Sequence, residues 1–173
     1  MKRTLSLIIF IVFLFNSIYS HAEKNQTLPK LTKPFPAVDF SLQGEDGNTY
    51  RLSSYRGQVV VMNFWATWCP PCRDEMPAME NLWQKVKGKG VVVLGINVGE
   101  NADIIFEFTG QYPVSFPLPM DIDGKVIESY PVRGLPTTYV VDPSGMVTHR
   151  AVGSRDWDGD EILKQLMQLR KVR

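Results

Sequence analysis

The chain has 173 residues, of which 44% are hydrophobic and 21% are charged, and its formal net charge is +1. This length and composition indicate one globular domain that can bury an adequate core without covalent cross-links. The near-zero charge gives no indication of a nucleic-acid partner. Because a core of this size needs no covalent cross-links, the two cysteines are not required as a structural disulfide framework.

The first 22 residues have the pattern of a secretory signal peptide. Lys2 and Arg3 form a positive n-region, residues 5–15 are an apolar run, and residues 20–22 provide small residues for a cut after Ala22. An uncleaved membrane anchor is the alternative, although the run is shorter than the roughly 20 apolar residues of a membrane span. Both interpretations predict an exported domain.

Residues 23–36 are polar, interrupted by prolines and without periodicity, so we expect a linker here and a domain over 37–173. The domain begins with a predicted β-hairpin. Alternating apolar residues indicate a strand over 37–42, and residues 49–52 form the second strand after a turn rich in Gly and Asn.

Two nearly continuous apolar runs, at 59–64 and 91–96, are typical of strands buried on both faces of a sheet. Between them, apolar residues at helical spacing predict a helix over 73–87. Pro77 lies inside this helix and is expected to kink it or to split it in two.

The second half of the chain alternates between predicted helices and strands. The helices are expected at 102–112, at 124–130 and from near 158, and the strands at 116–120, 137–141 and 146–152. Asn101 is a suitable N-cap, and Asp158 with Glu161 has the pattern of a capping box. This alternation predicts an α/β domain whose sheet is mostly parallel with an antiparallel edge.

The only cysteines, Cys69 and Cys72, are spaced C-x-x-C between the buried strand at 59–64 and the following helix. Free N–H groups and the positive end of the helix dipole favour a thiolate at this place, and the thiolate is the form that attacks disulfides. A bond between them would close a very short loop and stabilise the fold little. Beside a βαβ unit, this spacing indicates redox chemistry.

Residues 64–72 (FWATWCPPC) resemble the active site of the thioredoxin fold, and residues 134–139 (GLPTTY) resemble its cis-proline loop. The stretch from about residue 35 onward is similar to the exported, membrane-associated TlpA/ResA branch of thioredoxin-like thiol–disulfide oxidoreductases, as are residues 97–100 and the insert after them. That branch includes the reductants of cytochrome c maturation. The resemblance implies a central mixed sheet flanked by helices, with an N-terminal hairpin extension and a central helix–strand insert.

The resemblance also implies roles for individual residues. Cys69 would be the more exposed nucleophile and Cys72 the more buried resolving cysteine, so that turnover forms a Cys69–Cys72 disulfide. Pro136 would be cis and packed against the pair, while the backbone of Leu135 pairs with a substrate strand. Trp68 would flank the site as part of a docking surface.

Three polar residues are candidates for tuning the thiols. Many thioredoxins have a buried aspartate at the position of Asn63, and an amide cannot take a proton from Cys72. ResA-type proteins share this asparagine and carry a glutamate at the position of Glu75, so we expect Glu75 to tune or deprotonate the cysteines. A solvated first-turn acid is the alternative for Glu75, and for Glu100, a possible second acidic neighbour, an ordinary structural role is preferred.

Other site classes fit the sequence less well. Zinc requires three or four ligands, but His21 falls within the signal and His149 is expected to be solvated on an edge strand, so no metal and no cofactor is expected. Covalent haem requires C-x-x-C-H, and residue 73 is Arg. Copper chaperones with C-x-x-x-C and peroxidases with a single reactive cysteine have different motifs. A secreted interaction domain with a vestigial disulfide is the non-enzymatic alternative.

The expected function is that of an exported reductase of protein disulfides, with apocytochrome c as one possible substrate. An oxidase or isomerase working in the opposite direction is the alternative. The expected partners are a protein bearing a disulfide or thiols and a membrane-embedded electron donor of the DsbD or CcdA type, with no nucleic acid. We expect a monomer in the periplasm or on the outer face of the cytoplasmic membrane.

Overall fold

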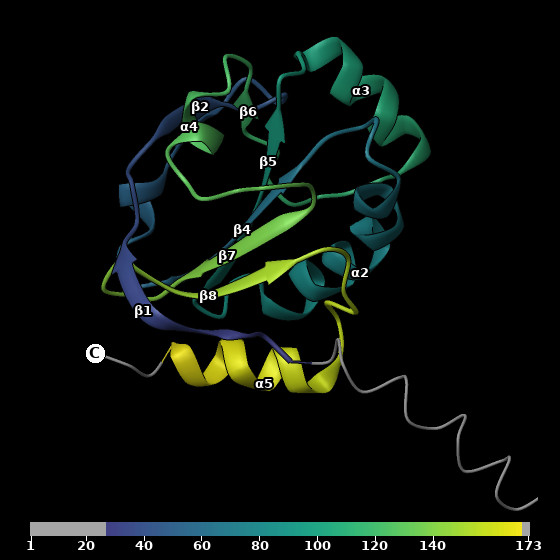
Figure 1. Cartoon of the computed structure of the whole chain (residues 1–173). Coiled ribbons are helices and arrows are strands. Elements are labelled where there is room, and N and C mark those ends of the chain that lie inside the picture. Colours follow the sequence, from purple (N-terminus) through teal and green to yellow (C-terminus); the bar gives the residue numbers. More distant parts are fainter. Residues whose placement is uncertain (1–26, 171–173) are drawn as a thin grey trace, which may run out of the picture.

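A six-stranded mixed sheet lies at the centre of the computed structural model, which describes residues 27–170 (Figure 1). The sheet order is β1-β8-β7-β4-β5-β6, and β2 and β3 form a separate hairpin. The strands are β1 (Lys30–Pro36), β2 (Ser41–Gln43), β3 (Thr49–Arg51), β4 (Val59–Trp65), β5 (Val91–Val98), β6 (Met120–Asp121), β7 (Thr137–Val141) and β8 (Met146–Val152). The helices are η3 (Leu52–Tyr55), α2 (Pro70–Val86), α3 (Ala102–Gln111), α4 (Lys125–Glu128) and α5 (Asp160–Leu169).

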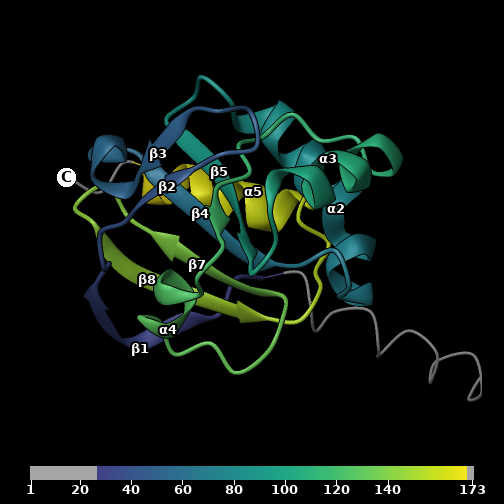
Figure 2. The ribbon, with the colours of Figure 1, turned by 90° about the horizontal axis from the view of Figure 1, so that it is seen from above.

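Strands β4 and β5 are the buried centre of the sheet, as their apolar sequences predict. One face carries a core formed with α2, α3 and α5, and the other carries a core under the hairpin and α4. Figure 2 shows the hairpin and α4 separated from α5 by the sheet, with α3 beside α2. Predictions of a hairpin and a central mixed sheet flanked by helices are thus confirmed.

Two predictions about the sheet are wrong. Residues 30–36, expected within a linker, form β1, which pairs antiparallel with β8. Three of the five strand pairings within the described sheet are antiparallel, so the sheet is not mostly parallel. Strand β1 accounts for part of both errors. It adds an antiparallel pairing to the sheet, and its polar residues and prolines are typical of an edge strand and equally of a linker.

Helix α2 runs without interruption through Pro77, so of the two outcomes predicted there the split is wrong, while the kink stays a prediction. Pro77 is exposed, and water can therefore satisfy the carbonyl that its ring leaves without a helical partner. The predicted capping box at Asp158 is also wrong, because α5 begins at Asp160 after Gly159. The Asp158 carboxylate instead accepts a hydrogen bond from Asn81 Nδ2 at 2.9 Å.

The N-cap prediction at Asn101 is confirmed, because its side chain accepts a hydrogen bond from the Ile104 N–H. Strand β6 and helix α4 are shorter than expected, at two and four residues. No helix between residues 27 and 170 has both the length and the hydrophobicity to cross a membrane. The predicted signal peptide lies outside the described residues.

Candidate active site

The cysteine pair lies where β4 leads into α2, as the sequence predicts. Cys69 is the N-cap of α2, Pro70 and Pro71 occupy its first two positions, and Cys72 follows. Proline is tolerated there because first-turn N–H groups have no helical acceptor. The two cysteines form a disulfide, and Cys69 retains 4% exposure against 0% for Cys72.

The loop before Cys69 is held by Glu100. The Glu100 Oε2 atom accepts hydrogen bonds from the Thr67 N–H at 2.9 Å and from Asn97 Nδ2 at 2.7 Å, and Oε1 accepts one from the Thr67 hydroxyl. Its side-chain hydrogen bonds therefore go to the loop and to β5. The preferred expectation of a structural role for Glu100 fits this geometry.

Glu75 is buried, with 1% exposure, so its interpretation as a solvated acid is wrong. Its Oε1 atom accepts a hydrogen bond from Asn63 Nδ2 at 2.8 Å, and its Oε2 atom accepts one from Trp157 Nε1 at 2.7 Å. Asn63 also donates to Thr138 Oγ1 at 3.0 Å. Burial raises the pKa of the Glu75 carboxyl to about 7, and the hydrogen bonds from Trp157 and Asn63 act in the opposite direction.

Glu75 shares a helix face with Cys72. Because Cys72 and Glu75 are three residues apart on α2, their side chains are neighbours on that face. The structure thus places a carboxyl group that can exchange a proton near pH 7 within one helical turn of a cysteine.

The Leu135–Pro136 peptide bond is cis. Pro136 is buried, and its carbonyl accepts a hydrogen bond from the Gly153 N–H at 2.9 Å. Leu135 packs against the core cluster that contains both cysteines. The loop at Leu135 therefore borders the same core as the pair. Trp68, which precedes Cys69 in the chain, is 66% exposed.

A surface pocket of about 230 Å³ adjoins the cysteine loop. It is lined by Thr67 from the loop before Cys69, Arg73 from α2, Glu107 from α3 and Tyr112 from the end of α3. Phe106, also on α3, is 77% exposed. Exposed aromatic side chains are suited to contact another protein.

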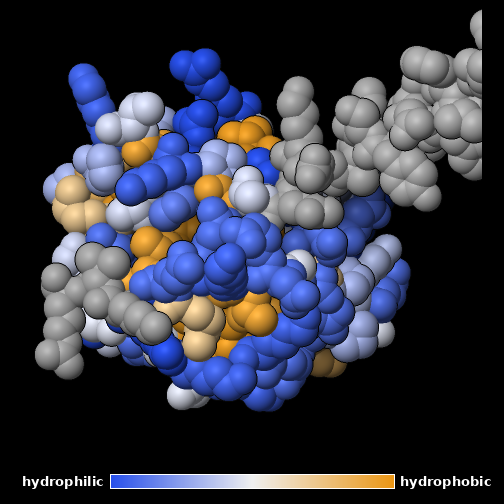
Figure 3. All heavy atoms as spheres, turned by 90° about the horizontal axis from the view of Figure 1, so that it is seen from below, coloured by the Kyte–Doolittle hydropathy of each residue, from blue (hydrophilic) through white to orange (hydrophobic). Residues whose placement is uncertain are grey.

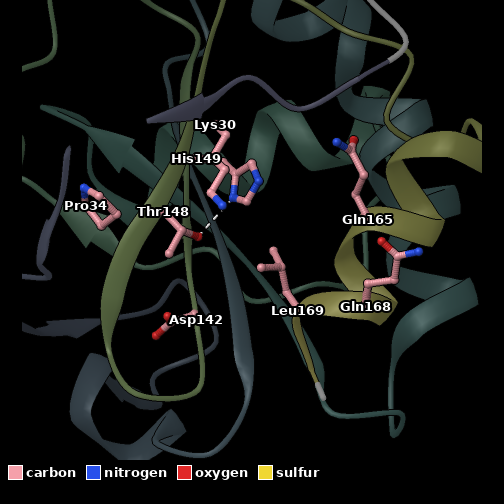
Figure 4. Close-up of a pocket in the computed structure, with 8 residues that line it drawn as sticks. All are labelled: Lys30, Pro34, Asp142, Thr148, His149, Gln165, Gln168 and Leu169. Atoms are coloured by element: carbon pink, nitrogen blue, oxygen red, sulfur yellow. Dashed lines mark hydrogen bonds between the residues drawn. The ribbon is translucent and has the colours of Figure 1, made fainter. Parts of the chain in front are cut away.

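A larger cavity of about 410 Å³ lies between β8 and α5, lined by neither cysteine. Figure 4 shows His149 and Lys30 on the strand side of this cavity and Gln168 on its helix side. Figure 3 views the molecule from below and shows hydrophobic atoms between hydrophilic groups on the face that carries α5. His149 is only 7% exposed, so the prediction that it is solvated is wrong. Strand β1 pairs with β8, so β8 is not the edge strand that the prediction assumed. Burial, and to a lesser extent Lys30, lowers the pKa of His149.

Sequence reasoning missed Trp157, the second donor to Glu75. A tryptophan between Asp156 and Asp158 indicates burial, but its partner lies 82 residues earlier in the chain. Thr138 was missed as a partner of Asn63 for the same reason. Within residues 27–170, no group of three or more His, Cys, Asp or Glu residues is arranged to hold a metal ion.

A cysteine pair at this strand-to-helix junction, opposite a cis-proline loop in a mixed α/β sheet, defines the thioredoxin-like class of thiol–disulfide oxidoreductases. A sequence profile of the AhpC/TSA family matches residues 34–150. The chain therefore belongs to this thioredoxin-like family.

Individual relatives define the type more closely. The thiol–disulfide oxidoreductase ResA of Geobacillus kaustophilus is 36% identical over 152 residues, which cover 88% of this chain and 86% of the relative. ResA of Bacillus subtilis is 34% identical over 141 residues, covering 82% and 75%. The crystal structure of a putative thiol:disulfide interchange protein DsbE from Chlorobium tepidum has a TM-score of 0.73 at 34% identity, over 81% of this chain and 99% of that chain. The resemblance to this class is confirmed, and the chain is a thiol–disulfide oxidoreductase of the ResA/DsbE type.

Proposed function

We propose that this protein is an exported reductase of protein disulfides that uses Cys69 and Cys72 as its dithiol. The observation that carries the proposal is the cysteine pair at the start of α2 with the buried Glu75 carboxyl one turn further along the same helix. Export is supported by the signal-like pattern of residues 1–22. Apocytochrome c is a candidate substrate, as the resemblance to the ResA branch implies.

In the proposed reaction, the Cys69 thiolate attacks one sulfur of a substrate disulfide and displaces the other as a thiolate, which takes up a proton. A mixed disulfide joins Cys69 to the substrate. Cys72 then loses its proton, attacks the Cys69 sulfur and releases the second substrate thiol. Substrate gains two electrons, and the protein is left with a Cys69–Cys72 disulfide.

Glu75 is proposed to accept the proton of Cys72 in the second step. A general base works best when its pKa is near the operating pH, and burial places the pKa of Glu75 at about 7. Asn63 cannot take this role because its amide donates to Glu75 and has no basic site.

Substrate docking is proposed at the exposed Trp68, the cis-proline loop at Leu135 and the pocket beside α3. The backbone of Leu135 is available to pair with an extended substrate segment. A membrane-embedded electron donor of the DsbD or CcdA type would return two electrons to the disulfide, on the periplasmic or outer face of the membrane. We propose that the protein acts as a monomer.

Activity is tested by insulin reduction with dithiothreitol as the electron source. Wild-type protein should accelerate insulin precipitation, and Cys69→Ser should not. Cys72→Ser retains the nucleophile but cannot resolve the intermediate, so it should accumulate mixed disulfides. A wild type no faster than Cys69→Ser would refute the proposed activity.

The direction of electron flow is tested by equilibrating the protein with glutathione buffers. A reductase should have a potential near or below the roughly −270 mV of thioredoxin. A potential close to the roughly −120 mV of a strong oxidant such as DsbA would overturn the reductase proposal and favour the oxidase alternative. Each 30 mV corresponds to about 1.4 kcal/mol for this two-electron couple.

A further inference from the structure

The indole of Trp157 is placed to control the Glu75 carboxylate. Trp157 is fully buried and belongs to the same core cluster as Cys69 and Cys72. Its Nε1–H donates to Glu75 Oε2 at 2.7 Å, while Asn63 occupies Oε1. An indole N–H can only donate, so this contact favours a carboxylate oxygen that accepts.

We propose that Trp157 is a positioning residue for the thiol–disulfide reaction, fixing the Glu75 carboxylate beside Cys72 in the form that can accept a proton. The inference deepens the proposed function and rests on the role proposed there for Glu75. Trp157 does not itself contact a reacting atom.

The loop that carries Trp157, residues 153–158, is held by hydrogen bonds at both of its ends. At its start, the Gly153 N–H donates to the Pro136 carbonyl at 2.9 Å. At its end, Asp158 accepts from Asn81 Nδ2 through its carboxylate and from Lys85 Nζ through its carbonyl. Because Asn81 and Lys85 belong to α2, this loop ties the active-site helix to the cis-proline loop, and Trp157 is held between them.

Among the described residues, Glu75 is held by neutral donors rather than by an ion pair. The strands packed against it contribute the neutral side chains Asn63 and Thr138. The charged or titratable groups near it are the cysteine pair on α2 and Arg155 on the loop, and the Arg155 guanidinium hydrogen-bonds to the Thr27 carbonyl at 3.3 Å. The Arg155 backbone N–H is a further neutral donor to Glu75, so loss of the indole N–H would remove one of three donors to the carboxylate.

The test is the pH dependence of the rate at which the reduced protein reduces a disulfide peptide. Trp157→Phe keeps an aromatic ring and removes the donor. We expect the acidic inflection of its profile to move up by about 1 pH unit, because a hydrogen bond to a charged group contributes enough to shift a pKa by about that amount. Trp83→Phe is the matched control, since Trp83 lies on α2, packs against the same core cluster, and its indole N–H donates to no other described residue.

A second pair of variants separates this inference from the role of Glu75. Glu75→Gln should remove the inflection, and adding Trp157→Phe to it should cause no further shift. An unchanged profile in Glu75→Gln would refute the proposed role of Glu75. Loss of the inflection in Glu75→Gln combined with a wild-type profile in Trp157→Phe would overturn the inference about Trp157 alone. A shift in Trp83→Phe as large as that in Trp157→Phe would overturn it as well.

A shape-conserving replacement covers the case in which Trp157→Phe does not fold. Site-specific incorporation of 3-benzothienylalanine at position 157 replaces the indole N–H with sulfur and retains the bicyclic ring. The same upward shift is expected, and a folded protein with a wild-type profile would overturn the inference.

Discussion

The burial of Glu75 predicts that the folded protein becomes less stable as the pH rises through neutrality. In the folded chain the pKa of Glu75 is raised from 4.5 to about 7 by burial. Between these values the folded state holds a proton that the unfolded state has lost. The stabilisation by this proton is complete below about pH 4.5 and is lost as the pH rises through 7.

The size of the effect follows from the same two values. One pKa unit corresponds to 1.36 kcal/mol, so the change from 4.5 to about 7 makes the folded state about 3 kcal/mol less stable at pH 8 than at pH 4. Glu75→Gln cannot ionise and should lack this loss. It should also carry a pH-independent cost of about 1–3 kcal/mol, because its amide cannot accept from both Asn63 and Trp157.

The assay is urea unfolding of the oxidised protein from pH 5 to pH 8, in which the disulfide prevents the cysteines from titrating. The free energy of unfolding of Glu75→Gln minus that of wild type should increase by about 2–3 kcal/mol over this range. His149 titrates in both proteins, so its contribution cancels in the difference. Asp74→Asn, which removes an exposed acid from the same helix, should show no such increase. A flat difference for Glu75→Gln would refute the assignment.

Three further predictions concern packing, capping and the covered edge of β8. Gly95→Ala should reduce the free energy of unfolding by about 1–3 kcal/mol in urea, because a Cβ there would lie 2.8 Å from a ring atom of Phe116; unchanged stability would contradict this packing. Asn101→Ala should cost about 1 kcal/mol in the same measurement through loss of the α3 N-cap, and no loss would argue against the cap. In Lys30→Gln the pKa of His149, followed by NMR, should rise because a nearby positive charge is removed; an unchanged titration would exclude that contribution.

The sequence predicted those parts of the fold that local patterns determine. The continuous apolar runs of β4 and β5 have few alternatives to buried strands, and the C-x-x-C spacing located the redox pair. Residues 30–36 were less predictable, because the prolines and polar residues of an edge strand are also those of a linker. The burial of His149 depends on that strand and was missed with it.

The environment of Glu75 could not be predicted because it depends on long-range contacts. From local sequence alone, a glutamate in the first turns of a helix is expected to be a solvated acid that the helix dipole stabilises. Its burial requires Asn63 from β4 and Trp157 from the loop after β8, 12 and 82 residues away. Only the resemblance to the ResA branch gave Glu75 a role before the structure placed it.

The contact between Asn63 and Glu75 also explains why an acid occupies only one of these two positions. Their side-chain atoms are 2.8 Å apart in a buried site. Two carboxylates at that distance could not both ionise, so one would remain protonated well above its ordinary pKa. An amide at position 63 instead donates to the carboxylate at position 75 and fixes its orientation. The amide and the acid therefore form one unit, in which the proposed proton acceptor lies on the helix that begins at the cysteine pair.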